Sequence, residues 1–196
     1  MHKNSVTRGY GLLETFLAKK RADMANRLIP RRLRKGRILD IGCGSTPFFL
    51  INTEFKEKYG IDYSVSRSNS KNLVLKNFDL NNSKMPFRNN FFETVIMLAV
   101  VEHMERDKLP ALFKEVARIL KPGGRFIITT PCPWAHFLLR LMARFRLVSP
   151  IEIKEHKYAY DKNSIAAYFD NAGFKSSKMK FGYFELFLNN WAYVDK

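Results

Sequence analysis

Gly36–Thr46 reads Gly-Arg-Ile-Leu-Asp-Ile-Gly-Cys-Gly-Ser-Thr, and this stretch decides the fold. An apolar strand runs into Asp40 and then into a loop with glycine at alternate positions. Glycine lets the main chain turn sharply and lets a ligand lie against bare backbone. Ser45 or Thr46 can cap a following helix whose first turn holds Pro47. The pattern predicts a nucleotide-binding loop at the carboxyl end of a first parallel strand.

The spacing of the glycines argues against a dinucleotide ligand. A dinucleotide fingerprint needs a third glycine three residues after the second. Here that position is Pro47, and no glycine follows Gly44 until Gly60. A pyrophosphate-binding turn is therefore not predicted.

Acidic residues end the next two predicted strands. Tyr59–Asp62 reads as a second strand that ends in an acid, and this carboxylate can accept from both hydroxyls of a ribose. Leu73–Asp79 reads as a third strand, and its closing acid can accept from an adenine amino group. Thr94–Leu98 predicts a fourth strand, and residues 120–129 turn a helix into a fifth. Ligands of open α/β sheets bind beyond the carboxyl ends of the strands, which is where these acids lie.

Five short motifs follow one another in a fixed order: Asp-Ile-Gly-Cys-Gly from Asp40, Gly-Ile-Asp from Gly60, Asp-Leu from Asp79, Glu-His from Glu102 and Leu-Lys-Pro-Gly-Gly from Leu120. In this order they resemble the class I S-adenosylmethionine-dependent methyltransferases, and most of all the small subfamily with the ubiquinone and menaquinone biosynthesis enzymes. The motifs span about half of the chain. The resemblance implies an α/β, Rossmann-like three-layer sandwich. Its mostly parallel sheet would have seven strands, the last one antiparallel.

The resemblance also implies S-adenosylmethionine as the cofactor. The residues placed around it are Asp40, Gly42 and Gly44 at the methionine end, Asp62 at the ribose, Tyr63, Asp79 and Leu80 at the adenine, and Leu98 at the amino-acid group. Two positions depart from the family pattern. Thr46 stands where many members have a third glycine, and Glu93 replaces the aspartate that opens the fourth strand. Neither departure removes a necessary cofactor contact.

Length and composition favour a single domain, residues 1–196. No apolar run is long enough to cross a bilayer, and the first residues lack the apolar stretch of a secretion signal. Because the chain has only two cysteines, we expect no disulfide framework, and we expect a cytoplasmic location. No cluster of cysteine and histidine has metal-ligand spacing, so we expect no metal.

The formal net charge of +16 is concentrated at the front of the chain. Up to Arg37, eleven Lys and Arg stand against Glu14 and Asp23. Such a surface attracts nucleic acid, anionic lipid or a phosphate-bearing substrate. The alternative is a solvated charged face without a partner.

The domain divides into four parts: a basic helix and linker (1–35), the cofactor-binding core (36–130), an insertion (131–160), and a last helix with the closing strands (161–196). Periodicity predicts helices over Gly11–Ile29, Glu105–Leu120 and Ser164–Asn171, the last capped by Asn163 or Ser164. The closing strands are predicted over Lys175–Phe181 and Trp191–Val194.

The insertion has a broad apolar stripe, with His136, Arg140 and Arg144 every four residues on its other side. The stripe consists of Trp134, Phe137, Leu138, Leu141, Met142 and Phe145. It can pack on the domain, close the acceptor pocket as a lid, or lie in a membrane interface as a peripheral contact.

Two histidines are candidates for a general base. His103 follows the fourth strand at the rim of the expected pocket, and it could instead cap the next helix. His156 can enter the pocket from the insertion. We interpret His2 and His136 as surface residues. Histidine suits proton removal near neutral pH.

The favoured acceptor is a small molecule, a sugar or a lipid-linked compound, because the insertion and the basic front helix suit an amphipathic acceptor with phosphate. The alternative is RNA, with the basic N-terminal region on its phosphates. Against RNA, the Asn/Asp-Pro-Pro-aromatic motif of amino-group methylation is missing where Leu98-Ala99-Val100 stands. A binding module without activity would need a damaged cofactor site, and the acids and glycines of that site are intact.

Overall fold

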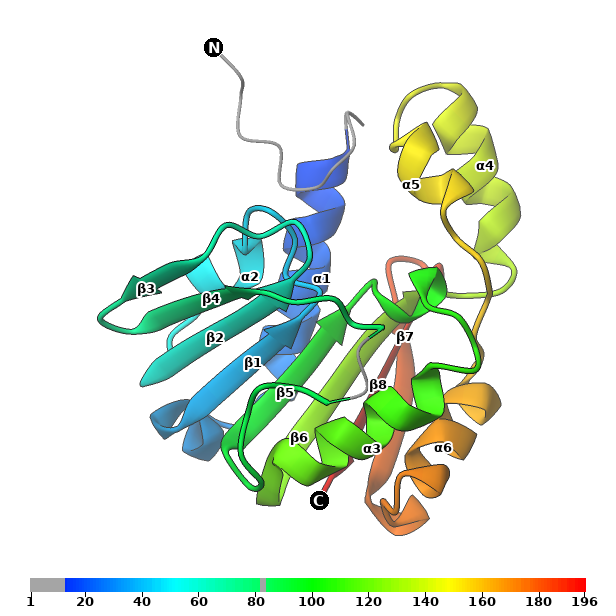
Figure 1. Cartoon of the computed structure of the whole chain (residues 1–196). Coiled ribbons are helices and arrows are strands. Elements are labelled where there is room, and N and C mark those ends of the chain that lie inside the picture. Colours follow the sequence, from blue (N-terminus) through cyan, green and yellow to red (C-terminus); the bar gives the residue numbers. More distant parts are fainter. Residues whose placement is uncertain (1–12, 82–83) are drawn as a thin grey trace.

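The computed structural model describes residues 13–81 and 84–196 and contains one mixed sheet of eight strands (Figure 1). The strand order is β3-β4-β2-β1-β5-β6-β8-β7. The strands are β1 (Arg37–Ile41), β2 (Glu57–Asp62), β3 (Ser68–Ser70), β4 (Leu73–Asn77), β5 (Phe92–Leu98), β6 (Leu120–Pro131), β7 (Met179–Phe184) and β8 (Asn189–Asp195).

The expected sheet of seven strands is wrong by one. The additional strand is β3, a three-residue edge strand that pairs antiparallel with β4 through Ser68–Ser70. The sequence pattern missed it because all three side chains are polar and exposed, so no alternation of apolar residues marks a strand. The antiparallel last strand is confirmed, since β8 pairs antiparallel with both β6 and β7.

Helices cover both faces of the sheet and make the three layers (Figure 1). The helices are α1 (Glu14–Leu28), α2 (Phe48–Ile51), α3 (Leu109–Ile119), α4 (Ala135–Arg144), α5 (Pro150–Lys154) and α6 (Lys162–Asn171), with short 3-10 turns at Arg31–Lys35, Val101–His103 and Ser176–Lys178. Alternate residues of the central strands pack into two hydrophobic cores, one on each face of the sheet. Val95 of β5 faces α3 and α6, whereas its neighbour Ile96 faces α1 and α2.

Two expected helix starts are wrong. The helix α6 is capped by Asp161, whose Oδ1 accepts from the backbone N of Ser164 at 2.9 Å, and not by Asn163 or Ser164. The helix α2 has only four residues and begins after Pro47 without a side-chain cap, so neither Ser45 nor Thr46 caps it. Both errors follow from a shift of one or two residues in the helix start.

The third strand also ends earlier than expected, at Asn77, so Asp79 lies in the turn that follows β4. The insertion forms α4 and α5, which stand beyond the end of the sheet and next to the start of α1 (Figure 1). The backbone N of Leu13 donates to the carbonyl of Leu147 at 2.9 Å. The front helix and the insertion are thus joined, although they are far apart in the sequence.

Candidate active site

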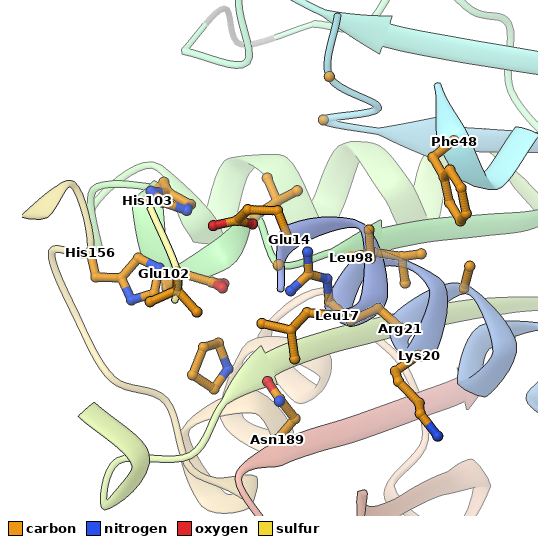
Figure 2. A pocket seen from close by; sticks show the side chains of 18 of the residues that line it. Glu14, Leu17, Lys20, Arg21, Phe48, Leu98, Glu102, His103, His156 and Asn189 are labelled. Carbon is orange, nitrogen blue, oxygen red and sulfur yellow. The ribbon is translucent and has the colours of Figure 1, made fainter. Parts of the chain in front are cut away.

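All ten residues that the sequence singles out line one cavity of about 1040 Å³. It lies at the carboxyl ends of β1, β2, β4 and β5, between α1 and the insertion. Pockets for one small ligand usually reach about 300–1,000 Å³, so this cavity has room for two. The predicted cofactor residues lie at one end and the two histidines at the other. Figure 2 shows the histidine end, with Arg21 reaching in from α1.

The turn after β1 requires glycine at two positions. Gly42 and Gly44 have φ values of +74° and +71°, which place both in the left-handed region. A Cβ on Gly42 would also lie 2.5 Å from Cγ2 of Val100. The backbone N of Gly42 donates to the carbonyl of Ile61 at 2.8 Å, which fixes the turn against β2.

Asp62 ties the glycine turn to the end of β2. Its Oδ2 accepts from the backbone N of Gly44 at 3.1 Å, and its Oδ1 accepts from the N and Oγ of Ser64 at 2.8 and 2.6 Å. Asp62 is buried and lines the cavity. The carboxylate is therefore held in one orientation by the loop that it closes, as a rigid acceptor for ligand hydroxyls requires.

Asp40 is the buried acid at the base of the turn. Burial and the neighbouring Asp62 carboxylate raise the pKa of Asp40 well above its usual range. A cationic ligand group at this end of the cavity would offset both effects and favour the ionised carboxylate. Burial also raises the pKa of the adjacent Cys43 thiol, which keeps that sulfur protonated.

The remaining predicted cofactor residues ring the same end of the cavity. Tyr63 is 55% exposed, and Leu98 is half-buried at the end of β5. Asp79 is exposed and its Oδ1 accepts from the backbone N of Asn81 at 2.9 Å, so a local turn orients it. Leu80 packs its side chain against the core beside α3. The sequence assigned roles to these residues, and the structure shows that they all line the same cavity.

The chain turns sharply directly after Leu98. Ala99 has a φ of +57°, in the region that only glycine enters without strain. Its backbone N donates to the carbonyl of Thr129 at 2.9 Å, which holds the turn against β6. Strained residues of this kind gather at functional sites, and no sequence signal pointed to this alanine.

Glu102, His103 and His156 form the other end of the cavity (Figure 2). The rings of His103 and His156 meet edge to face with centroids 4.8 Å apart. Glu102 is buried and its Oε2 accepts from Oγ1 of Thr130 at 3.1 Å, while Oε1 has no hydrogen-bond partner among the described residues. Burial raises the pKa of Glu102.

The environment of His156 separates the two base candidates. Burial, and then the charges of His103, His136 and Arg21, lower the pKa of His156 to about 3. A group with that pKa is neutral and weakly basic near neutral pH. The interpretation of His136 as a surface residue is wrong, because its ring lies 5.6 Å from His156 and its buried Nε2 has no partner among the described residues. His2 lies outside the described residues.

Sequence reasoning missed the contribution of α1 to the site. Arg21 and Leu17 line the cavity, and buried Glu14 accepts from the backbone N of Ser149 at 2.6 Å. The apolar periodicity predicted the helix, and its charged residues were interpreted as a surface that attracts polyanions or as a solvated face. The available signal for this contribution was the spacing of Glu14 and Arg21, which lie two helical turns apart on the same side of the helix as Leu17.

One grouping joins residues from two segments. One carboxylate oxygen of Glu102 and one ring nitrogen each of His103 and His156 lie within 4.8 Å of one another, a set that could hold a metal ion. The Arg21 charge acts on both Glu102 and His156, and a positive neighbour disfavours a cation. Sequence spacing could not find this set, because His156 comes from the insertion.

The sequence profile of a family described as a methyltransferase domain matches residues 13–177. The chain belongs to this family. This methyltransferase domain is 30% identical over 97 residues to a probable tRNA methyltransferase 9B of Bos taurus. The match covers 46% of this chain and 20% of that protein. The chain thus spans about a fifth of the length of the tRNA methyltransferase relatives it matches.

Solved methyltransferases share the fold of this domain. A SAM-dependent methyltransferase from Archaeoglobus fulgidus aligns with a TM-score of 0.68 at 18% identity, covering 93% of this chain and 98% of that one. Phosphoethanolamine N-methyltransferase 2 of Haemonchus contortus, solved with S-adenosyl-L-methionine, aligns with a TM-score of 0.65 at 16% identity, covering 91% and 52%. No described helix of the methyltransferase domain is both long and apolar enough to span a membrane.

Proposed function

We propose that this methyltransferase domain transfers the methyl group of S-adenosylmethionine to a small-molecule, sugar or lipid-linked acceptor. One observation carries the proposal. Three acids and a glycine turn meet at one end of a single cavity, and a histidine pair lies at the other. The family match and the shared fold support the same reaction class.

The acidic end suits a cationic nucleoside. Asp62 would accept from the ribose hydroxyls, because the Gly44 and Ser64 bonds hold its carboxylate in place. Asp40 would face the charged methionine end, directly or through water, and Gly42 would let that end approach the backbone. Asp79, Leu80 and Tyr63 would surround the adenine, and Leu98 would offer main-chain groups to the amino-acid group.

S-adenosylmethionine supplies an activated methyl group and leaves as a neutral thioether. The protein must therefore hold the acceptor in line with the methyl carbon, and alignment of this kind is worth up to roughly 7–11 kcal/mol in ideal cases. For a hydroxyl acceptor, a base must also take the proton.

We assign proton removal to His103 and a positioning role to His156. The low pKa of His156 leaves it neutral but too weak a base for the task near neutral pH. Its ring packs edge to face on His103, which limits the rotation of that imidazole. The acceptor proton would pass to a ring nitrogen of His103 as the acceptor oxygen bonds to the methyl carbon.

The lining of the acceptor end favours an amphipathic molecule. Leu17, Met142 and Ile153 contribute apolar surface, and Lys20 and Arg21 contribute positive charge from α1. An acceptor with an apolar portion and a phosphate would satisfy both. An enzyme named for phosphoethanolamine, a phosphate-bearing molecule, has a similar fold at 16% identity, which is compatible with the phosphate part of this proposal.

RNA is the second candidate, and the relationship to a probable tRNA methyltransferase favours it. The net charge of +16 would attract phosphates of any sequence. Methyl transfer from tritiated S-adenosylmethionine, measured in parallel on total RNA, on a lipid extract and on a small-molecule extract, separates the two. Label in the lipid or small-molecule fraction supports the first proposal, and label in RNA with steeply salt-dependent binding supports the second.

The cofactor site is tested by Asp62→Asn. Asparagine keeps the size of the side chain and removes the charge, so we expect the affinity for S-adenosylmethionine to fall about tenfold or more, equal to about 1.4 kcal/mol or more of binding free energy. Titration calorimetry measures it. Asp107→Asn, on an exposed acid away from the cavity, is the matched control and should bind as the wild type does. An unchanged dissociation constant for Asp62→Asn would show that the ribose assignment is wrong.

A further inference from the structure

An uncovered apolar surface lies beside the mouth of the cavity. It consists of Trp134, Phe137, Leu141 and Phe145 along α4, with Leu186 and Phe187 from the turn between β7 and β8, and we call it the aromatic ridge. Phe137 is 79% exposed and Leu186 is 92% exposed. Large apolar side chains gathered in this way mark interaction surfaces, whereas single exposed ones do not.

The helix α4 has two apolar faces, and only one of them is covered. Leu139 and Met142 line the cavity, and Ala143 is buried. Phe137, Leu141 and Phe145 recur at helical spacing on the opposite side and face solvent. Because α4 stands beyond the end of the sheet, no described element packs on this outer face (Figure 1). Of the three alternatives for the stripe, packing of the whole stripe on the domain is therefore wrong, because all of its residues except Met142 are exposed.

The turn between β7 and β8 exposes its apolar residues in a strained backbone conformation. Glu185, Leu186 and Phe187 have φ values of 52°, 54° and 67°, three consecutive left-handed residues without a glycine. Each such residue is less stable than its right-handed form by roughly 1–2 kcal/mol. The indole Nε1 of Trp134 donates to the carbonyl of Phe187 at 3.0 Å and so joins this turn to α4. The ridge is thus one connected surface.

Positive charge surrounds the ridge. Residues 131–150 contain no Asp or Glu, and Arg140, Arg144 and Arg146 are all exposed. A symmetric pairing of two copies through α4 would bring these arginines toward one another, because a two-fold interface joins the same patch on both subunits. The charge is complementary to an anionic surface and not to a second copy of this chain.

We propose that the aromatic ridge docks the protein on anionic lipid bilayers. Aromatic and leucine side chains enter the boundary between headgroups and acyl chains, and arginines beside them contact the lipid phosphates. Leu186 belongs both to the ridge and to the cavity lining, so docking would place the cavity mouth at the bilayer. This inference goes beyond methyl transfer, because vesicle binding is measured without cofactor or acceptor.

Co-sedimentation with vesicles tests the proposal. We expect the wild type to bind vesicles of phosphatidylcholine with 30% phosphatidylglycerol at least tenfold more strongly than pure phosphatidylcholine vesicles. Phe137→Ser/Phe145→Ser should lower this partition about a hundredfold, since burial of each phenylalanine contributes about tenfold. Ile51→Ser, at a 57% exposed residue of α2, is the matched control and should bind as the wild type does.

The arginines are tested separately. Arg140→Gln/Arg144→Gln should reduce binding to the anionic vesicles about 25-fold, since each basic side chain near such a surface contributes about fivefold. Arg67→Gln, at an exposed arginine outside the ridge, should change it little. Binding of S-adenosylhomocysteine by every variant shows that the fold is kept. If the wild type does not bind S-adenosylhomocysteine, the proposed function is contradicted. The vesicle result would still test membrane docking, because it does not depend on the cofactor.

Trp134 reports the depth of insertion. The chain has two tryptophans, so Trp191→Phe leaves Trp134 as the single fluorophore. We expect its emission to shift to the blue on addition of anionic vesicles and to be quenched by brominated acyl chains. The proposal is overturned if emission is unchanged or if the Phe137→Ser/Phe145→Ser variant binds as tightly as the wild type. A dimer in sedimentation velocity that this variant dissociates, or binding that is confined to RNA, would overturn it too.

Discussion

At the scale of single residues, the glycine turn is determined by two separate requirements. Gly42 and Gly123 have almost the same positive φ, +74° and +75°. A Cβ on Gly42 would collide with Val100, whereas a Cβ on Gly123 would meet nothing within 4 Å. The pair therefore separates the strain of the left-handed backbone from the steric contact with the wall of the site.

We expect Gly42→Ala to lower the free energy of unfolding by about 2–4 kcal/mol and Gly123→Ala by about 1 kcal/mol. Both variants force alanine into the left-handed region, and only the first also overpacks the site. Urea denaturation measures both. Equal losses in the two variants would mean that Val100 moves aside without cost.

At the scale of elements, α1 and the insertion together close the end of the cavity that holds the histidine pair. Buried Glu14, in the first turn of α1, accepts from the backbone N of Ser149, and Leu13 is bonded to Leu147. Arg21 extends from the same helix into the cavity (Figure 2). The position of α4 and α5 thus depends on α1, and so does the shape of this end of the cavity.

We expect Glu14→Ala to lower the free energy of unfolding by about 1.5–3 kcal/mol, because it removes a buried hydrogen bond to a charged group. Hydrogen exchange should become faster at residues 147–149 and stay unchanged in β1. Glu54→Ala, at an exposed glutamate, is the control and should change stability by less than about 0.5 kcal/mol. Unchanged exchange at 147–149 would show that the insertion is positioned without α1.

At the scale of the whole molecule, buried ionisable groups act on stability in opposite directions. The pKa of His156 is lowered in the folded state, so acid pH favours the unfolded chain, where this imidazole takes up a proton readily. The pKa values of Asp40, Glu102 and Glu185 are raised, so the folded state gains relative stability when these carboxyls are protonated. The measured pH dependence is the balance of the two.

The contribution of His156 is isolated by His156→Gln. An imidazole with a folded pKa of about 3 and an unfolded pKa of about 6.5 destabilises the fold as pH falls below 6.5, by about 2 kcal/mol at pH 5. We therefore expect the stability of the wild type relative to the variant to fall by about 1.6 kcal/mol between pH 6.5 and pH 5, because about 0.4 kcal/mol is already lost at pH 6.5. Urea denaturation at each pH checks it, and parallel curves for the two proteins would contradict it.

The sequence by itself determined which residues gather at the glycine-turn end of the cavity. Asp40, Gly42, Gly44 and Asp62 follow directly on apolar strands, and local spacing is enough to bring such residues to one edge of a parallel sheet. The number of strands and the starts of α2 and α6 were wrong, because short polar strands and helix caps have weak local signals.

Only the tertiary structure decided the histidine end of the cavity. Glu14 accepts from Ser149, and the charge of Arg21 acts on His156, each across more than a hundred residues of sequence, and no periodicity records such a relation. The same holds for the pKa of His156, which depends on burial by distant segments, and for the outer face of α4. An apolar stripe looks alike in sequence whether it is covered or not, because covering depends on where the helix lies relative to the sheet.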